Sequence, residues 1–152
     1  GMGLSFALGC ALAARLDHKD YLVYALLGDG ECDEGEVWEA AMAASYHKAT
    51  NLIAFIDRNR IQNDRPTDEV MGLEPLGQRW RSFGWRVLEA DGHDFNSLLP
   101  TIDKARQRRT RPTVIIAHTV KGKGVSFMEN TATFHGRAPT EEEMEKAMQE
   151  LA

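Results

Sequence analysis

The chain has 152 residues, of which 43% are hydrophobic and 27% charged, the composition of an ordinary soluble globular protein with room for a single core. Its net charge of −5 gives no indication of a nucleic-acid or membrane partner, and its apolar stretches stay shorter than the roughly 18 residues that a membrane span needs. Two cysteines, Cys10 and Cys32, form no metal or redox spacing, so we expect free thiols in a cytoplasmic protein.

The first 15 residues, GMGLSFALGCALAAR, are apolar and mostly small. They lack the basic segment that precedes the apolar part of a signal peptide. Their small residues instead suit a helix packed tightly against a sheet. We therefore expect a helix of the folded domain at this end of the chain.

Two apolar runs in the next third of the chain predict buried strands. They cover residues 21–27 and 52–56 and are bounded by Gly, Asp and Asn. Between them, residues 34–48 place small or apolar side chains three and four positions apart, which predicts a helix packed on a sheet. A strand, a helix and a strand within this length form a βαβ unit, whose strands run parallel.

Polar residues that end these two strands are candidate ligands of a phosphate-bound cation. Gly28 and Gly30 flank Asp29, so the backbone can turn sharply there and approach a ligand. The helix N-terminus that follows offers free N–H groups to a phosphate. Asp29 supplies an anionic oxygen and Asn59 a neutral one, which is the kind of set that Mg²⁺ takes together with phosphate oxygens. Because the carboxyl ends of parallel strands form the ligand-binding edge of a sheet, the sequence predicts a metal-bridged diphosphate.

The second half of the chain continues the alternation of strands and helices. A polar loop is expected at residues 62–72, followed by a helix at 74–83 that Pro75 opens. The remaining elements are a strand at 85–90, a helix at 95–109 and a strand at 112–119. The sequence therefore predicts an α/β fold, a parallel sheet with helices on both faces, in one domain over residues 1–152.

The polar strings after the later elements have structural explanations. The string DGHD at 91–94 is expected to form a turn in which Asp94 or Asn96 caps the next helix, which makes His93 structural. The basic run at 106–111 is expected at a solvated helix end, where the helix dipole favours cations.

The sequence gives no specific functional assignment to two lysines and three histidines. Lys121 and Lys123 lie between glycines after a strand, and they either contact a phosphate or belong to a surface loop. His18 and His47 are expected at the surface near helix ends, whereas His118 ends a strand and has no clear assignment.

Several strings of the chain together resemble one enzyme family. GDGECDEGEVWEAAMAA at 28–44, NLIAFIDRNRIQND at 51–64 and GLS near the start are similar to sequences of transketolases. The resemblance implies the thiamine-diphosphate-binding domain of a cytoplasmic transferase of the pentose phosphate pathway, which moves a two-carbon ketol unit between sugar phosphates. In such enzymes the cofactor carries the carbanion chemistry and this domain holds it.

The resemblance also assigns ligands by position. Asp29, Asn59 and the backbone carbonyl of Ile61 would hold a divalent cation, Mg²⁺ or in its place Ca²⁺ or Mn²⁺. The wider cofactor-binding set would be Gly28, Asp29, Gly30, Glu31, Asn59, Ile61 and His135.

Three residues take catalytic roles from the resemblance. His135 lies in FHGRAP, which is similar to the HGxP string whose histidine approaches the diphosphate and the substrate, although an exposed loop histidine is the alternative. Glu34 and Glu39 match positions in a carboxylate network that links two active sites across a dimer interface. Carboxylates near a helix N-terminus are also favoured by the dipole, and both explanations can hold.

The chain departs from the family pattern in ways that bear on activity. The family's upstream segment, with histidines that contact cofactor and substrate, is not in this sequence, so we expect a fragment or a subunit. The glutamate that activates the cofactor also belongs to another domain. We expect an inactive chain that needs a C-terminal transketolase section or subunit in a homo- or hetero-oligomer. Asn63 and Arg65 stand where the family usually has an apolar residue and often a glycine.

Two other functions stay open at this point. One is another thiamine-diphosphate enzyme, either deoxyxylulose-phosphate synthase or a 2-oxoacid dehydrogenase component, although the strings D-x-N-x-I and WEA favour transketolase over both. The other is a non-catalytic assembly subunit, which the change at Asn63 would support.

Overall fold

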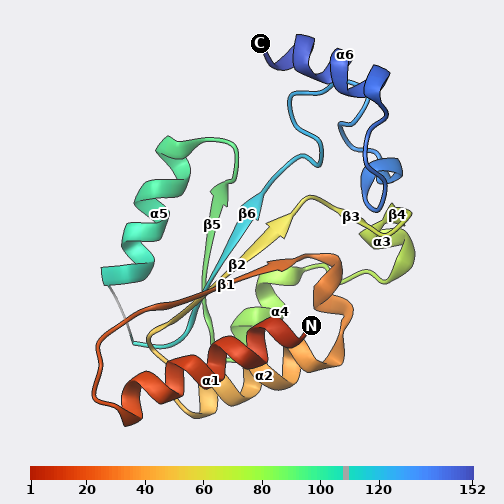
Figure 1. Ribbon diagram of the computed structural model, residues 1–152. Helices are drawn as coiled ribbons and strands as arrows, with labels where there is room; N and C mark the ends of the chain where they lie inside the picture. The colour runs from red at the N-terminus through yellow and green to blue at the C-terminus, as the bar shows by residue number, and fades with distance from the viewer. Residues whose placement is uncertain (108–109) are drawn as a thin grey trace.

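A four-stranded parallel sheet lies at the centre of the computed structural model, which describes residues 1–107 and 110–152 (Figure 1). The strands stand in the order β1–β2–β6–β5. Their bounds are Val23–Gly28 for β1, Leu52–Arg58 for β2, Arg86–Asp91 for β5 and Thr113–His118 for β6. The α/β fold with a parallel sheet is confirmed, with strand ends displaced by one or two residues from the predicted ones.

Helices cover both faces of this sheet, as predicted. The bounds of the helices that pack on the sheet are Met2–Leu16 for α1, Gly35–Tyr46 for α2, Leu76–Ser82 for α4 and Phe95–Gln107 for α5. Helices α1, α2 and α4 share one core with β1, β2 and β6, in which Trp80 and Trp85 are fully buried. Alanines on α1 and α2 let these helices approach the sheet closely. Helix α5 packs on the opposite face, over Ile53 and Ile115.

The segment that follows β1 contains one element more than the sequence predicts. The helix predicted at 34–48 is present as α2, which starts at Gly35, but a short 3-10 helix that the sequence did not predict, η1 (Gly30–Asp33), lies between it and the GDG string. The cause is a tight turn at Asp29, whose side chain accepts a hydrogen bond from the Gly30 N–H and whose carbonyl accepts one from the Cys32 N–H. The dipole of α2 therefore does not begin at the glycines.

The predicted polar loop at 62–72 contains regular structure instead. Its elements are β3 (Ile61–Gln62), β4 (Arg65–Pro66) and the short helix α3 (Thr67–Val70). β3 and β4 pair antiparallel around a turn at Asn63 and Asp64, and Asn63 has a φ of 46°. Asparagine tolerates this left-handed conformation better than most residues, which explains the polar residue at that position.

The C-terminal part extends away from the carboxyl end of the sheet, as Figure 1 shows. After β6 come the 3-10 helix η2 (Ala132–Phe134) and the helix α6 (Glu141–Leu151), which has no buried residue. The predicted cap before α5 is present, because the Asp94 carboxylate accepts a hydrogen bond from the Asn96 N–H. Arg108 and Arg109 of the predicted basic run lie outside the described residues.

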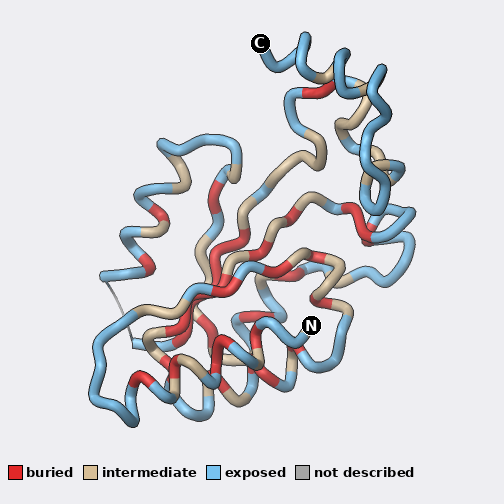
Figure 2. The backbone as a smooth tube through the Cα atoms, viewed as in Figure 1, coloured by how far each residue is buried: buried red, intermediate tan, exposed pale blue. Residues whose placement is uncertain are grey.

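Burial is concentrated in the sheet and on the helix faces that turn toward it (Figure 2). Several large apolar side chains remain exposed on the outer face of α1 and on the edge strand β1, notably Phe6 at 77%, Leu16 at 80% and Leu26 at 75%. Among the described residues, no helix combines the length and the apolar character that crossing a membrane requires.

Candidate functional site

A cavity of about 400 Å³ opens at the carboxyl edge of the sheet, beside the ends of β1 and β2. Its lining consists of Gly28, Asp29, Gly30, Glu31, Glu34, Asn59, Ile61, Gln62, Asn63 and His135. Every site residue expected from the sequence is in this lining except Glu39, which is exposed on α2. Residues from three separate segments of the chain, 28–34, 59–63 and the segment around His135, therefore meet at one cavity.

The parallel register of β1 and β2 brings the two strand ends together. Gly28 pairs with Asp57, so Asp29 and Asn59 leave the sheet side by side. The Asp29 N–H donates to the Asp57 carbonyl at 3.2 Å, which continues the pairing by one residue. Asp29 is only 3% exposed, so its carboxylate must be held by partners within the protein.

The two oxygens of the Asp29 carboxylate have different partners. Oδ2 accepts from Arg58 Nη1 at 2.7 Å and from the Arg60 N–H at 2.6 Å. Oδ1 accepts from the Gly30 N–H at 2.8 Å, which leaves it with capacity for one further ligand. Arg60, whose N–H donates to Oδ2, has a φ of 65°, a left-handed conformation that is uncommon for a residue other than glycine.

Neutral oxygens complete a set of hard donors at the cavity. Asn59 Oδ1 accepts from the Ile61 N–H at 2.9 Å and keeps a second lone pair. Pro66 lies opposite Ile61 in the β3–β4 pair, and it has no N–H that could bond to the Ile61 carbonyl.

These three oxygens fit a divalent cation whose remaining ligands come from a bound molecule. The described residues contain no group of three or more His, Cys, Asp or Glu side chains that could hold a metal ion by themselves. One carboxylate, one amide oxygen and one carbonyl are the pattern expected where phosphate oxygens share the coordination. The residues present therefore fit a metal-bound diphosphate.

Gln62 shapes the wall of the cavity and was missed in the sequence. It is 8% exposed and donates from Nε2 to Asp33 Oδ2 at 2.8 Å, which joins β3 to η1. A Cβ on Gly30 would lie 2.3 Å from Gln62 Oε1 and 2.4 Å from Gln62 Cβ. Gly30 is thus required by this side chain as well as by the sharp turn. The contact spans 32 positions, and no local pattern could have indicated it.

Glu31 and Cys32 contribute to the turn rather than to reactivity. Glu31 Oε2 accepts from the Gly28 N–H at 3.1 Å, so this carboxylate stabilises the backbone of the GDG turn. Cys32 is fully buried, and burial raises the pKa of its thiol to about 12, with nearby Glu31 and Asp29 adding to the shift. The thiol stays protonated at neutral pH and is a poor nucleophile.

Of the histidines and lysines considered from the sequence, His135 lines the cavity and the others lie outside it. His135 reaches the cavity from the end of η2. His93 accepts a hydrogen bond from the Val120 N–H at 2.7 Å, which is the structural role expected of it. Lys123 pairs with Glu129 at 3.6 Å, and neither Lys121 nor Lys123 is in the cavity lining.

The outlying histidines match their expected positions. His18 and His47 are exposed near the ends of α1 and α2. His118, which the sequence left without an assignment, has Nε2 3.1 Å from Glu89 Oε2 at an exposed position on β6.

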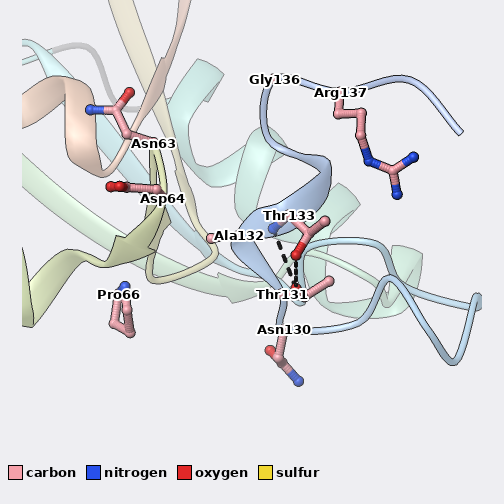
Figure 3. A pocket seen from close by; sticks show the side chains of 9 residues that line it. All are labelled: Asn63, Asp64, Pro66, Asn130, Thr131, Ala132, Thr133, Gly136 and Arg137. Carbon is pink, nitrogen blue, oxygen red and sulfur yellow. Dashed lines mark hydrogen bonds between the residues drawn. The ribbon is translucent and has the colours of Figure 1, made fainter.

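A second, larger groove of about 580 Å³ adjoins the cavity and shares Asn63 with it (Figure 3). It lies between the β3–β4 turn and the segment 130–137, and its lining includes Asp64, Thr131 and Thr133. Arg137 points away from Asn63 and Asp64 and is held by Glu143 through two hydrogen bonds of 2.8 Å. The groove therefore presents hydroxyl, amide and carboxylate groups, while its arginine is already paired.

The chain matches a described protein family over almost its full length. The family is "Transketolase, thiamine diphosphate binding domain", and the match covers residues 3–152. Among similar proteins, one subunit of the apulose-4-phosphate transketolase of Phocaeicola vulgatus is 46% identical over 152 residues, which are 100% of this chain and 54% of the relative. A 6-deoxy-6-sulfo-D-fructose transketolase subunit of Clostridium sp. is 43% identical over 99% of this chain and 55% of its own length. The chain thus spans about half the length of these relatives.

A solved structure gives the same result for the fold. The transketolase of Campylobacter jejuni superposes with a TM-score of 0.92 at 31% sequence identity, over 98% of this chain and 24% of that enzyme. The chain belongs to the transketolase family and corresponds to its thiamine-diphosphate-binding domain.

Proposed function

We propose that this chain binds thiamine diphosphate through a divalent cation, as one section of a transketolase that moves a two-carbon ketol unit between sugar phosphates. One observation carries the proposal: Asp29, Asn59 and Ile61, taken from two neighbouring strand ends, line the same cavity as His135. The transketolase names of the relatives favour this function over the other thiamine-diphosphate enzymes considered above. The pentose phosphate pathway and a cytoplasmic location belong to the same proposal.

In this proposal, the residues of the chain bind the cation and orient the diphosphate of the cofactor. Asp29 Oδ1, Asn59 Oδ1 and the Ile61 carbonyl hold Mg²⁺, or Ca²⁺ or Mn²⁺ in its place. The turn at Gly28 and Gly30 would let the backbone approach the diphosphate, and Glu31 holds this turn by accepting from the Gly28 N–H. The cofactor supplies the carbanion chemistry when it is bound.

His135 is proposed to act on the substrate side of the cavity. From there its imidazole can donate to a phosphate oxygen or to an alkoxide that develops during the reaction. The adjoining polar groove contains Asn63 and Thr131, whose side chains can form hydrogen bonds with the hydroxyl groups of a sugar.

A partner is part of the proposal because the chain corresponds to about half of relatives that are named as subunits. We propose that residues 1–152 form one domain that joins a C-terminal transketolase section or subunit, and that the chain is inactive without it. Glu34, exposed at the start of α2, and Glu39 would lie at the interface between two such active sites. The exposed apolar face of α1 is a suitable contact surface.

The cation site is tested by calorimetry of thiamine diphosphate binding in the presence and absence of Mg²⁺, using the chain co-expressed with its partner. Asp29→Asn removes the ligand charge but keeps a hydrogen-bonding side chain. We expect at least a roughly 100-fold loss of Mg²⁺-dependent affinity, beyond what outer-shell substitutions cost.

Asp68→Asn serves as the matched control because Asp68 is an exposed carboxylate on α3. It should leave cofactor affinity unchanged. Equal affinities for wild type and Asp29→Asn would show that the cation site is assigned wrongly.

A further inference from the structure

Arg58 is a buried arginine at the carboxyl end of β2, directly before the candidate cation ligand Asn59. It is 5% exposed, although arginine rarely lies that deep in a protein without a specific partner. Its guanidinium joins three segments of the chain: the turn at Asp29, the helix α3 at Thr67, and the start of α4 at Glu74.

The contacts of Arg58 fill most of its donor capacity. Nη1 donates to Asp29 Oδ2 at 2.7 Å and to Thr67 Oγ1 at 3.4 Å. Nε donates to Glu74 Oε1 at 3.0 Å, and Nη2 donates to the same oxygen. Burial works against the charged form of Arg58, but the bonds to Glu74 and Asp29 outweigh it and raise its pKa. The guanidinium is therefore a permanent positive charge.

Glu74 holds Arg58 in a fixed place. Its second oxygen, Oε2, accepts from the Leu76 N–H at 3.0 Å, at the first residue of α4. Leu76 itself is buried in the main core. Glu74 therefore fixes the guanidinium relative to α4, a helix that packs on the sheet.

This arrangement divides the Asp29 carboxylate between two tasks. Oδ2 is occupied by Arg58 and by the Arg60 N–H, so the carboxylate cannot rotate without breaking both bonds. Oδ1, which has only the Gly30 N–H as a partner, is the oxygen left for a cation. A bidentate carboxylate ligand is excluded as long as Arg58 keeps Oδ2.

We propose that Arg58 is a positioning residue for the divalent cation site, which holds Asp29 by one oxygen, presents the other, and makes the site prefer Mg²⁺ over Ca²⁺. This inference rests on the proposed function. The physical reason is coordination geometry. Mg²⁺ demands a near-ideal octahedron with ligands at about 2.1 Å, whereas Ca²⁺ accepts irregular and bidentate ligands at about 2.3–2.6 Å.

The positive charge of Arg58 and its positioning of Asp29 have opposite effects on the affinity for Mg²⁺. A positive charge beside a cation site weakens cation binding by Coulomb repulsion, so a purely electrostatic role predicts tighter Mg²⁺ binding once that charge is removed. A positioning role predicts weaker Mg²⁺ binding after the same change. The sign of the effect in a charge-removing variant therefore separates the two roles.

The test measures apparent Kd values for Mg²⁺ and Ca²⁺ by calorimetry at saturating thiamine diphosphate, in the complex of the chain with its partner. Arg58→Gln removes the charge, and Arg58→Lys keeps it without the fork that reaches Asp29 and Glu74 together. For both variants we expect the Kd for Mg²⁺ to rise about 10- to 100-fold, as for other residues that orient metal ligands. The Kd for Ca²⁺ should change by much less.

Glu74→Gln is the second variant, because a buried arginine can be needed for folding. The Glu74 side chain is 50% exposed, and its replacement loosens Arg58 without touching Asp29. Like the Arg58 variants, it should lower the preference for Mg²⁺ over Ca²⁺. Arg111→Gln removes an exposed arginine just before β6, outside the cavity lining, and should change neither Kd.

An unchanged ratio of the two Kd values in Glu74→Gln and in every Arg58 variant that folds, or tighter Mg²⁺ binding by Arg58→Gln, would overturn the inference. If the wild-type complex itself shows no cation-dependent binding of thiamine diphosphate, the proposed function fails instead.

Discussion

At the scale of single residues, the glycines of the GDG string have different physical reasons to be there. Gly30 lies beneath the Gln62 side chain, and any Cβ at that position would overlap with it. A Cβ on Gly28 would meet nothing closer than Glu31 at 4.0 Å. Packing within the chain therefore explains why residue 30 is glycine. The glycine at position 28 is explained instead by the backbone turn and by the ligand that we propose.

Replacing Gly30 by alanine tests this difference. Gly30→Ala should destabilise the fold by about 1–3 kcal/mol, because the clash involves the Cβ of Gln62 and not only the end of a flexible side chain. The measurement is urea unfolding followed by circular dichroism.

Two further variants support the comparison. Gly35→Ala places a methyl group where nothing lies within 4 Å, and it should be neutral or stabilise by up to about 1 kcal/mol. The double substitution Gly30→Ala with Gln62→Ala should recover part of the loss. An equal loss with and without Gln62 would show that the overlap is not the cause.

At the scale of elements, α6 is held by polar contacts at both ends and not by a core, since Glu150 near its end accepts hydrogen bonds from the Ser126 N–H and hydroxyl. It has no buried residue, and a capping box joins Thr140 and Glu143 at its start. The hydrogen bonds from Arg137, and after them the Thr140 N–H, lower the pKa of Glu143 to about 2. Charge at this single carboxylate therefore stabilises the start of the helix.

The pH dependence of α6 follows from that shift. Because the folded pKa lies below the unfolded value of 4.5, the stabilisation is fully present above about pH 4.5 and is lost as the pH falls toward 2. Amide hydrogen exchange of residues 141–151 should accelerate over this window, relative to the intrinsic rate at each pH. Glu143→Gln should show faster exchange already at pH 6 and a smaller step than the wild type on acidification, because only Glu150, whose pKa the Ser126 N–H lowers, then remains to lose a stabilising charge. A wild-type helix without such a step would contradict this role of Glu143.

At the scale of the whole molecule, the exposed apolar surface points to assembly. Phe6 is 77% exposed on α1, and Leu26 on the edge strand β1 is 75% exposed. Solvated apolar patches of this kind usually mark a contact surface. The proposed role of the chain as one section of a larger enzyme gives that surface a partner.

Phe6→Glu should therefore weaken assembly without affecting the fold. We expect the dissociation constant of the complex to rise about 30-fold, the effect of losing an aromatic residue that contributes about 2 kcal/mol to an interface. Analytical ultracentrifugation of the co-expressed complex measures it. Met148→Glu, at a 63% exposed position on α6, is the control and should assemble like the wild type. Assembly of Phe6→Glu with the wild-type dissociation constant would argue against the α1 face as the interface.

The local patterns of the sequence determined much of this molecule. Short apolar runs bounded by turn residues predicted the four strands and their parallel arrangement, because strand length and helix periodicity are properties of neighbouring residues. The same patterns put Asp29 and Asn59 at strand ends, and therefore at one edge of the sheet. The elements that were missed, such as β3, β4 and α3, are short and rest on one turn and few contacts.

Only the tertiary structure decided how the candidate ligands are held. Arg58 meets Asp29 across 29 positions, and Gln62 meets Asp33 across the same interval. Such pairs depend on the register of β1 against β2 and on the path of the β3–β4 turn, which no local pattern specifies. The sequence determined which residues end these strands, while the folded structure decided that the Asp29 carboxylate keeps Oδ2 for Arg58 and leaves Oδ1 with a single partner, the Gly30 N–H, because these contacts depend on how distant segments pack.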